Sequence, residues 1–177
     1  MRVKRALLAT VLCLGLAIPA LAAPAAKSLV AVEPSLPLPA TRYSDGRKPA
    51  GFDALRGKPF IVNVWATWCI PCVKEMPALD RLSAKLAPDG IAVVALSEDD
   101  GGEAQVKPFL EKLKVTRIAH HLYDPDLKAF QDFAIRGLPT TFVVSAQGRI
   151  VARLEGAAEW DSPEMVRQIK AALAAAR

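Results

Sequence analysis

Apolar residues follow two different periods along the chain, and these periods divide it into strands and helices. Residues 59–66 ("PFIVNVWA") form a nearly continuous apolar and β-branched run, which is typical of a strand covered on both faces. Residues 69–87 instead carry apolar side chains at helical spacing, at Val73, Met76, Leu79, Leu82 and Leu86. Residues 91–98 ("IAVVALSE") return to the strand pattern. The alternation predicts a strand–helix–strand unit in a buried sheet.

The next third of the chain continues this alternation. We expect a helix through residues 106–113 and a short extended segment around residues 121–123. A further helix is expected to carry Leu127, Phe130, Phe133 and Ile135 and to end at Gly137.

The C-terminal segment predicts a hairpin and a closing helix. Residues 140–156 alternate well around Gln147-Gly148, which indicates two antiparallel strands. Asp161 or Ser162 is the expected N-cap of the last helix, with Pro163 in its first turn. The side chains that this helix is expected to bury are Met165, Ile169 and Leu173.

Ahead of the first buried strand, Asp45-Gly46 is a turn signal for a short hairpin, and a brief helical turn is expected to stop at Gly57. The full order is then β-hairpin, β, α, β, α, β, α, ββ, α. We therefore predict an α/β fold in which a central mixed sheet is flanked by helices.

The N-terminal segment is typical of a secretory signal. Arg2, Lys4 and Arg5 precede an uncharged apolar run, and a small-x-small cleavage site follows at residues 20–22. We predict a cleaved signal peptide over residues 1–22; the alternative is an uncleaved inner-membrane anchor formed by residues 6–22. Residues 23–35, rich in Ala and Pro, are expected to be a flexible lead-in to a domain over residues 36–177. Either way, we expect the rest of the chain to lie outside the cytoplasm.

The net charge is much smaller once this segment is set aside. The whole chain carries 23 basic and 18 acidic residues, a net charge of +5. Three of the basic residues fall in residues 1–22, which leaves 20 basic against 18 acidic and a net charge of +2. No concentrated basic face is indicated, so we expect no nucleic-acid partner.

Cys69 and Cys72 carry the candidate chemistry. Of the three cysteines, Cys13 lies in the apolar N-terminal run and is assigned no function. Cys69 and Cys72 could be a redox pair, half of a metal site or a structural disulfide. A structural disulfide is disfavoured because so short a loop hardly constrains the unfolded chain. A metal site would need a second pair of ligands, and no further cysteine is present. His120 and His121 are the only histidines, and we expect them to be a solvated loop pair; we predict no metal.

As a redox pair, the two cysteines would divide the work. Cys69 falls in the first turn of the predicted helix, where unpaired N–H groups and the helix dipole favour a thiolate, the nucleophile of disulfide exchange. Cys72, one turn later, would resolve the mixed disulfide. Pro71 between them restrains the turn.

Two longer segments resemble a known family. "GKPFIVNVWATWCIPCVKEMPALDRL" (57–82) and "GLPTTFVVSAQGRIV" (137–151) are similar to the TlpA/ResA branch of the thioredoxin superfamily, of the redoxin (AhpC/TSA) type, and most of all to TlpA. The similarity covers roughly residues 36–175, including an inserted helix and strand in the middle and the "AEW" before the last helix.

This resemblance implies a thioredoxin-like fold and a periplasmic protein-disulfide reductase that needs no bound cofactor. Its implied partners are protein disulfides of cytochrome oxidase copper-site assembly, with a membrane thiol transporter as electron donor. The alternatives are a cytochrome c maturation reductase and, as a non-enzyme, a copper-binding chaperone. A thiol peroxidase is disfavoured because the two cysteines lie together at one helix start.

The resemblance also implies roles for individual residues. Pro139 aligns with the family's cis-proline, which would leave the Leu138 backbone free to pair with an extended partner segment. Trp68 would cover the edge of the disulfide, unless it is an ordinary core residue. Ile70 and Pro71 would complete the partner-binding surface, and Pro77 aligns with a helix-kinking proline.

One position departs from thioredoxins. Where they carry a buried Asp on the strand before the motif, this chain has Asn63, which cannot titrate. Glu75, three residues after Cys72, matches a glutamate of this branch. If partly buried, its carboxyl would have a raised pKa and could take the proton from Cys72; the alternative is a solvated surface glutamate.

Overall fold

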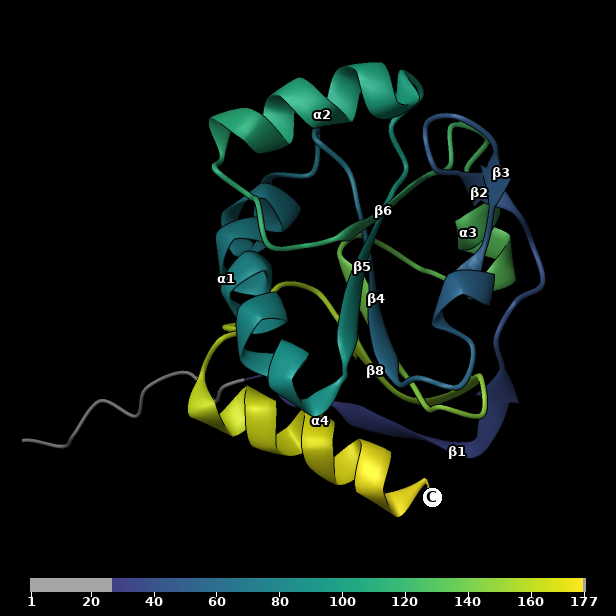
Figure 1. Cartoon of the computed structure of the whole chain (residues 1–177), viewed down its shortest axis with the longest axis vertical. Helices are drawn as coiled ribbons and strands as arrows, with labels where there is room; N and C mark the ends of the chain where they lie inside the picture. Colours follow the sequence, from purple (N-terminus) through teal and green to yellow (C-terminus); the bar gives the residue numbers. More distant parts are fainter. Residues whose placement is uncertain (1–26, 177) are drawn as a thin grey trace, which may run out of the picture.

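A computed structural model describes residues 27–176, and within them eight strands form one mixed sheet in the order β1-β8-β7-β4-β5-β6-β2-β3 (Figure 1). The strands are β1 (Val30–Pro37), β2 (Tyr43–Ser44), β3 (Pro49–Ala50), β4 (Phe60–Trp65), β5 (Ala92–Ser97), β6 (His120–Tyr123), β7 (Thr140–Val144) and β8 (Arg149–Glu155). Strands β4, β5 and β6 run parallel, and the others pair antiparallel. The predicted mixed α/β fold is confirmed.

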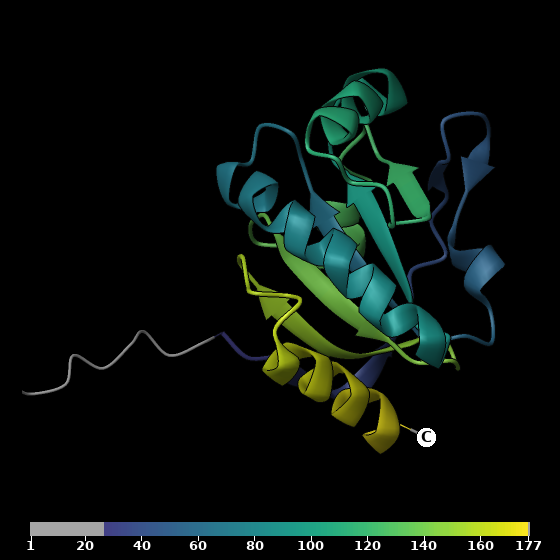
Figure 2. The ribbon, with the colours of Figure 1, turned by 60° about the vertical axis from the view of Figure 1, so that its left-hand side comes forward.

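Helices cover the two faces of this sheet unequally. The helices are α1 (Ile70–Leu86), α2 (Gly102–Lys112), α3 (Lys128–Asp132) and α4 (Pro163–Ala175), with 3₁₀ turns at η1 (Phe52–Leu55) and η2 (Ala87–Asp89). α1, α2 and α4 contribute to one apolar core, whereas η1 and α3 pack against the opposite face with a second core. Figure 2 shows α1 and α4 lying side by side over the first face.

Most predicted elements lie where the pattern placed them. β4 is buried at every position, as its continuous apolar run requires. Ser162 caps α4 by accepting a hydrogen bond from the Met165 amide, with Pro163 next to it. The inserted helix and strand are α2 and β6, and the N-terminal hairpin is β2–β3. In that hairpin, the Asp45 amide donates to the Lys48 carbonyl, so Gly46 and Arg47 lie at the tip, one residue later than expected.

The N-terminal lead-in differs from expectation. The predicted signal or anchor lies outside the described residues, but Val30–Pro37 form β1 and pair with β8 instead of remaining flexible. β1 pairs with the edge of β8 that β7 leaves free, and partly buried Val32 packs against the second core. The register shifts between Ala31 and Leu36, which accommodates Pro34 on an edge strand.

Two further expectations are wrong in detail. The third helix spans only Lys128–Asp132 and ends before Gly137, because Leu127 and Ala134 have φ values of 58° and 48°, outside the helical region.

His120 and His121 are not a solvated loop pair but lie in β6 beside β5, partly buried. Nε2 of His121 lies 2.9 Å from the Ile118 carbonyl oxygen, and burial lowers the pKa of both rings.

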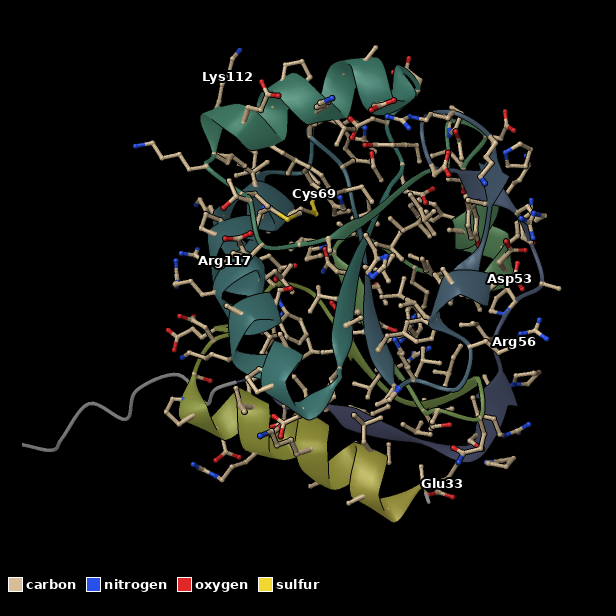
Figure 3. All side chains as sticks on the ribbon, viewed as in Figure 1. Glu33, Asp53, Arg56, Cys69, Lys112 and Arg117 are labelled. Carbon is tan, nitrogen blue, oxygen red and sulfur yellow. A yellow bond between two sulfur atoms is a disulfide. The ribbon has the colours of Figure 1, made fainter. Side chains whose placement is uncertain are left out.

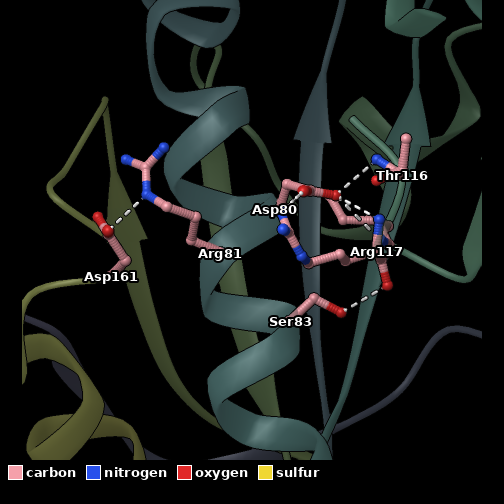
Figure 4. Close-up of polar contacts among 7 residues, drawn as sticks. Asp80, Arg81, Ser83, Thr116, Arg117 and Asp161 are labelled. Carbon is pink, nitrogen blue, oxygen red and sulfur yellow. Dashed lines mark hydrogen bonds and ion pairs between the residues drawn. The ribbon is translucent and has the colours of Figure 1, made fainter. Parts of the chain in front are cut away.

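A buried carboxylate ties α1 to the insert. Asp80, in the middle of α1, accepts hydrogen bonds from the Thr116, Arg117 and Ile118 amides and from the Arg117 guanidinium (Figure 4). Burial alone would raise the pKa of Asp80, but these donors outweigh it and hold the pKa below its usual value. The contact fixes the loop between α2 and β6 to the helix that begins at the cysteines.

Candidate functional site

Cys69 and Cys72 form a disulfide at the start of α1 (Figure 3). Strand β4 ends at Trp65, a turn closes through the bond from the Cys69 amide to the Ala66 carbonyl, and the helix begins at Ile70. Cys69 is the N-cap, and its sulfur lies 3.3 Å from the Cys72 amide nitrogen. A sulfur at this end of a helix is where N–H groups and the dipole favour negative charge. Cys69 is 6% exposed and Cys72 0%, so the first cysteine is the more accessible.

The apolar residues on either side of Cys69 are exposed to solvent. Trp68 is 61% exposed and Ile70 is 70% exposed, so Trp68 is not a core residue. Pro71 between the cysteines is also exposed. Large apolar groups that stay in water beside a reactive centre are typical of a surface that another molecule covers.

The Leu138–Pro139 peptide bond is cis, as expected for the position that aligns with the family's cis-proline. Pro139 is buried, and its carbonyl accepts a hydrogen bond from the Gly156 amide. The backbone of Leu138, by contrast, makes no hydrogen bond to any group within residues 27–176. It therefore keeps donor and acceptor capacity for an extended segment of another chain.

Glu75 is buried, as predicted, with 4% of its surface exposed. Its Oε2 accepts hydrogen bonds from the Trp160 indole at 2.7 Å and the Ala158 amide at 3.0 Å. Its Oε1 accepts one from Asn63 at 3.0 Å. Burial raises the pKa of Glu75 to about 7, although these three donors act to lower it. The surface-glutamate alternative is thereby excluded, and the carboxyl is suited to exchange a proton near neutral pH.

Asn63 takes the place of a buried acid but keeps a polar role. Its side-chain amide donates to Glu75 and to the Thr141 hydroxyl on the adjacent strand β7. Its Oδ1 is buried and has no hydrogen-bond partner within residues 27–176. The buried titratable group beside the cysteines is therefore Glu75 on α1, and the residue on β4, Asn63, orients it.

The predicted residues fall into one assembly. Cys69 caps α1, and Cys72 and Glu75 lie within it; the Leu138–Pro139 bond lies just ahead of β7, which pairs with β4. Three groups that contact this assembly were not predicted from the sequence: Trp160 and Ala158 beside Glu75, and Asp99, which binds Thr67 in the turn before Cys69. Only the "AEW" of the family resemblance pointed toward the first two.

Residues 34–153, more than half of the chain, match the sequence profile of the family described as AhpC/TSA. The chain belongs to the AhpC/TSA family. This membership agrees with the resemblance to the TlpA/ResA branch, which is of the same redoxin type.

Two relatives of the chain are named for thiol–disulfide chemistry. The chain is similar to the thiol-disulfide oxidoreductase ResA of Bacillus cereus, with 32% identity over 102 residues that cover 58% of this chain and 57% of the relative. It is also similar to the thiol:disulfide interchange protein HelX of Rhodobacter capsulatus, with 37% identity over 106 residues, 59% of this chain and 56% of the relative. The chain thus matches little more than half the length of these relatives.

A solved structure confirms the fold. The crystal structure of a putative thiol:disulfide interchange protein DsbE from Chlorobium tepidum superposes with a TM-score of 0.68 at 24% identity, covering 78% of this chain and 96% of that one. At this identity the likeness establishes the thioredoxin-like fold alone.

Proposed function

We propose that this protein is a thiol–disulfide oxidoreductase that reduces disulfides in other proteins. The observation that carries the proposal is the Cys69–Cys72 pair at the amino end of α1, with buried Glu75 one turn further on the same helix. The names of the relatives, thiol-disulfide oxidoreductase and thiol:disulfide interchange protein, support the same chemistry.

The reaction begins from the dithiol. The Cys69 thiolate attacks one sulfur of the partner's disulfide, forms a mixed disulfide and displaces the other sulfur as a thiolate. The Cys72 thiol gives its proton to Glu75 and attacks the Cys69 sulfur, which releases the second partner thiolate and leaves the Cys69–Cys72 disulfide. Two electrons pass from the protein to the partner, and another dithiol protein must return them; no bound cofactor takes part.

The partner is held on the exposed surface around the pair. Trp68, Ile70 and Pro71 offer apolar contact, and the free backbone of Leu138 pairs with an extended segment of the partner beside Pro139. A disulfide presented in an extended, apolar segment suits this surface.

The finer assignment rests on the family resemblance. We propose that the partners are proteins that assemble the copper site of cytochrome oxidase, that a membrane thiol transporter supplies electrons, and that the protein works in the periplasm. Within residues 27–176, no helix combines the length and hydrophobicity needed to cross a membrane. The runner-up is a reductase of cytochrome c maturation. Exchange rates with disulfide peptides taken from each class of partner separate the two.

The reduction potential of the Cys69–Cys72 couple tests the proposed direction of electron flow. We expect a reducing value, nearer to about −270 mV than to the about −120 mV of a strong oxidant. The same samples should reduce a protein disulfide, and Cys69→Ser should abolish this. A potential near the oxidising value would make the protein a donor of disulfides and overturn the proposal. Copper titration of the reduced protein tests the chaperone alternative.

A further inference from the structure

Asp99 is a buried carboxylate with an unusual set of donors. It follows the end of β5 and is 0% exposed. The donors that reach it are the Thr67 amide at 3.0 Å, the Thr67 hydroxyl at 2.5 Å, the Ser97 hydroxyl at 2.7 Å and the Gln105 side-chain amide at 2.8 Å. Neither the proton transfer nor the partner surface described above uses this group.

Thr67 belongs to the turn that delivers the redox pair. The bond from the Cys69 amide to the Ala66 carbonyl closes the turn, and Thr67 is its second residue, just before exposed Trp68. Asp99 therefore holds this turn through both the backbone and the side chain of Thr67. β4 fixes the start of the turn through its pairing with β5.

The inserted helix α2 completes the contact. The side-chain amide of Gln105 donates to Asp99 and also to the Thr67 hydroxyl at 2.9 Å, and its side-chain oxygen Oε1 accepts from the Gly101 amide. Because Gln105 is exposed while Asp99 is buried, it shields the outer side of the contact from water. A buried carboxylate satisfied from several sides is a rigid anchor.

We propose that Asp99 is a positioning residue for the redox pair: by holding Thr67, it keeps the Cys69 sulfur against the amino end of α1, where the thiolate is stabilised. The inference rests on the proposed function. It adds a residue outside the Cys-x-x-Cys motif and connects the insert between β5 and β6 to the reactive turn.

Replacing Asp99 changes the reactivity of Cys69 in opposite directions, depending on whether Asp99 acts through its negative charge or by holding Thr67 in place. A negative charge near a thiolate disfavours it, so an effect through charge alone would make Cys69 more reactive once the charge is lost. Loss of the anchor instead lets the sulfur move away from the helix terminus, which makes Cys69 less reactive. The direction of the change therefore separates the two.

The test measures alkylation of Cys69 against pH in proteins that also carry Cys72→Ser, so that a single thiol reacts within the folded domain. We expect Asp99→Asn to slow alkylation at pH 7 about tenfold and to move the pH midpoint of the reaction upward. Asp100→Asn is the matched control, because the adjacent Asp100 is exposed, and its rate should stay within about twofold. Faster alkylation by Asp99→Asn, or a rate within twofold of its parent, would overturn the inference.

Thr67→Val keeps the test decisive if Asp99→Asn does not fold. It removes the hydroxyl bond at a half-buried position and keeps the amide bond. We expect an alkylation rate about threefold lower, which Thr67→Ser should restore; an unchanged rate for Thr67→Val would overturn the inference. Protein-disulfide reduction by the unmodified protein is measured in parallel. If it is absent, the proposed function fails; if it is present and Asp99→Asn alkylates normally, only the inference fails.

Discussion

Two buried carboxyl groups lie on α1, little more than one turn apart, and their environments push their pKa values in opposite directions. Glu75 is 4% exposed and Asp80 2%, so both side chains are shielded from water. Asp80 meets a guanidinium and three backbone N–H groups, and its pKa is lowered. The hydrogen-bond donors to Glu75 are all neutral, burial raises its pKa to about 7, and the charge of Lys27 lowers the pKa least of these influences. A carboxylate held directly by a guanidinium and several amides is a structural anchor, whereas one buried among neutral donors is suited to carry a proton.

The largest effect is expected from replacing Asp80, the carboxylate with the lowered pKa. We expect Asp80→Ala to lower the free energy of unfolding by about 3 kcal/mol, because the amides of residues 116–118 and the Arg117 side chain lose their acceptor. Disulfide exchange by the folded fraction should be unchanged. Urea unfolding measures the loss, with Asp89→Ala, which breaks an exposed ion pair with Lys170, as a control that should cost under about 0.5 kcal/mol. A loss below about 1 kcal/mol would show that Asp80 is no anchor.

Glu75 should behave in the opposite way. We expect Glu75→Gln to fold normally and to slow protein-disulfide reduction roughly hundredfold, or about 2.7 kcal/mol in the barrier, because Cys72 loses its proton acceptor. Glutamine can still accept from Trp160 and Ala158 through one oxygen, and Asn63 Oδ1 can turn to accept its N–H. The exposed Glu159→Gln is the matched control. A reduction rate within about threefold of the unmodified protein would remove Glu75 from the mechanism.

The raised pKa of Glu75 also makes stability depend on pH. The folded protein holds this proton more tightly than the unfolded chain, so the contribution is fully present below about pH 4.5 and is lost as pH rises to about 7. Relative to Glu75→Gln, the unmodified oxidised protein should lose about 2 kcal/mol of stability over this range, since each pH unit corresponds to about 1.4 kcal/mol and residual solvation reduces the total. Urea unfolding at a series of pH values from 4 to 8 measures the free energy of unfolding of each protein. If this free energy varies with pH in the same way for both proteins, the account is contradicted.

The smallest effect is expected from the cation of the Asp80 cluster. The Arg117 side chain is 56% exposed, so its ion pair with Asp80 is screened by water. We expect Arg117→Ala to cost about 0.5 kcal/mol, far less than Asp80→Ala, because the three backbone donors remain. Thermal unfolding at low and high salt checks this. A cost close to that of Asp80→Ala would mean that the ion pair, and not the amides, holds the loop.

The sequence was sufficient for groups fixed by local pattern. The buried strand, the helix that follows the cysteines and the turn after Val144 depend on neighbours a few residues away, and all were predicted. The family resemblance led us to expect Trp68 at the edge of the disulfide and a partly buried carboxyl at Glu75.

Features that depend on contacts between distant parts of the chain could not be predicted from the sequence. The donors that tune Glu75 include Ala158 and Trp160, which are 83 and 85 residues away. Asp99 lies 32 residues from Thr67, in a run of acids that reads as solvated surface. β1 was missed because its pairing depends on the free edge of β8, and the short α3 because the left-handed backbone of Leu127 and Ala134 has no signal in these residue types.

The most direct test of this account is the carboxyl ¹³C chemical shift of Glu75 in the oxidised protein, followed from pH 3 to pH 9 and assigned with Glu75→Gln. The account predicts that Glu75 titrates with a midpoint near 7, while Asp80 in the same spectra titrates below its ordinary value. A Glu75 midpoint near 4.5 would contradict the account, because so weak a base takes up the proton of Cys72 poorly near neutral pH.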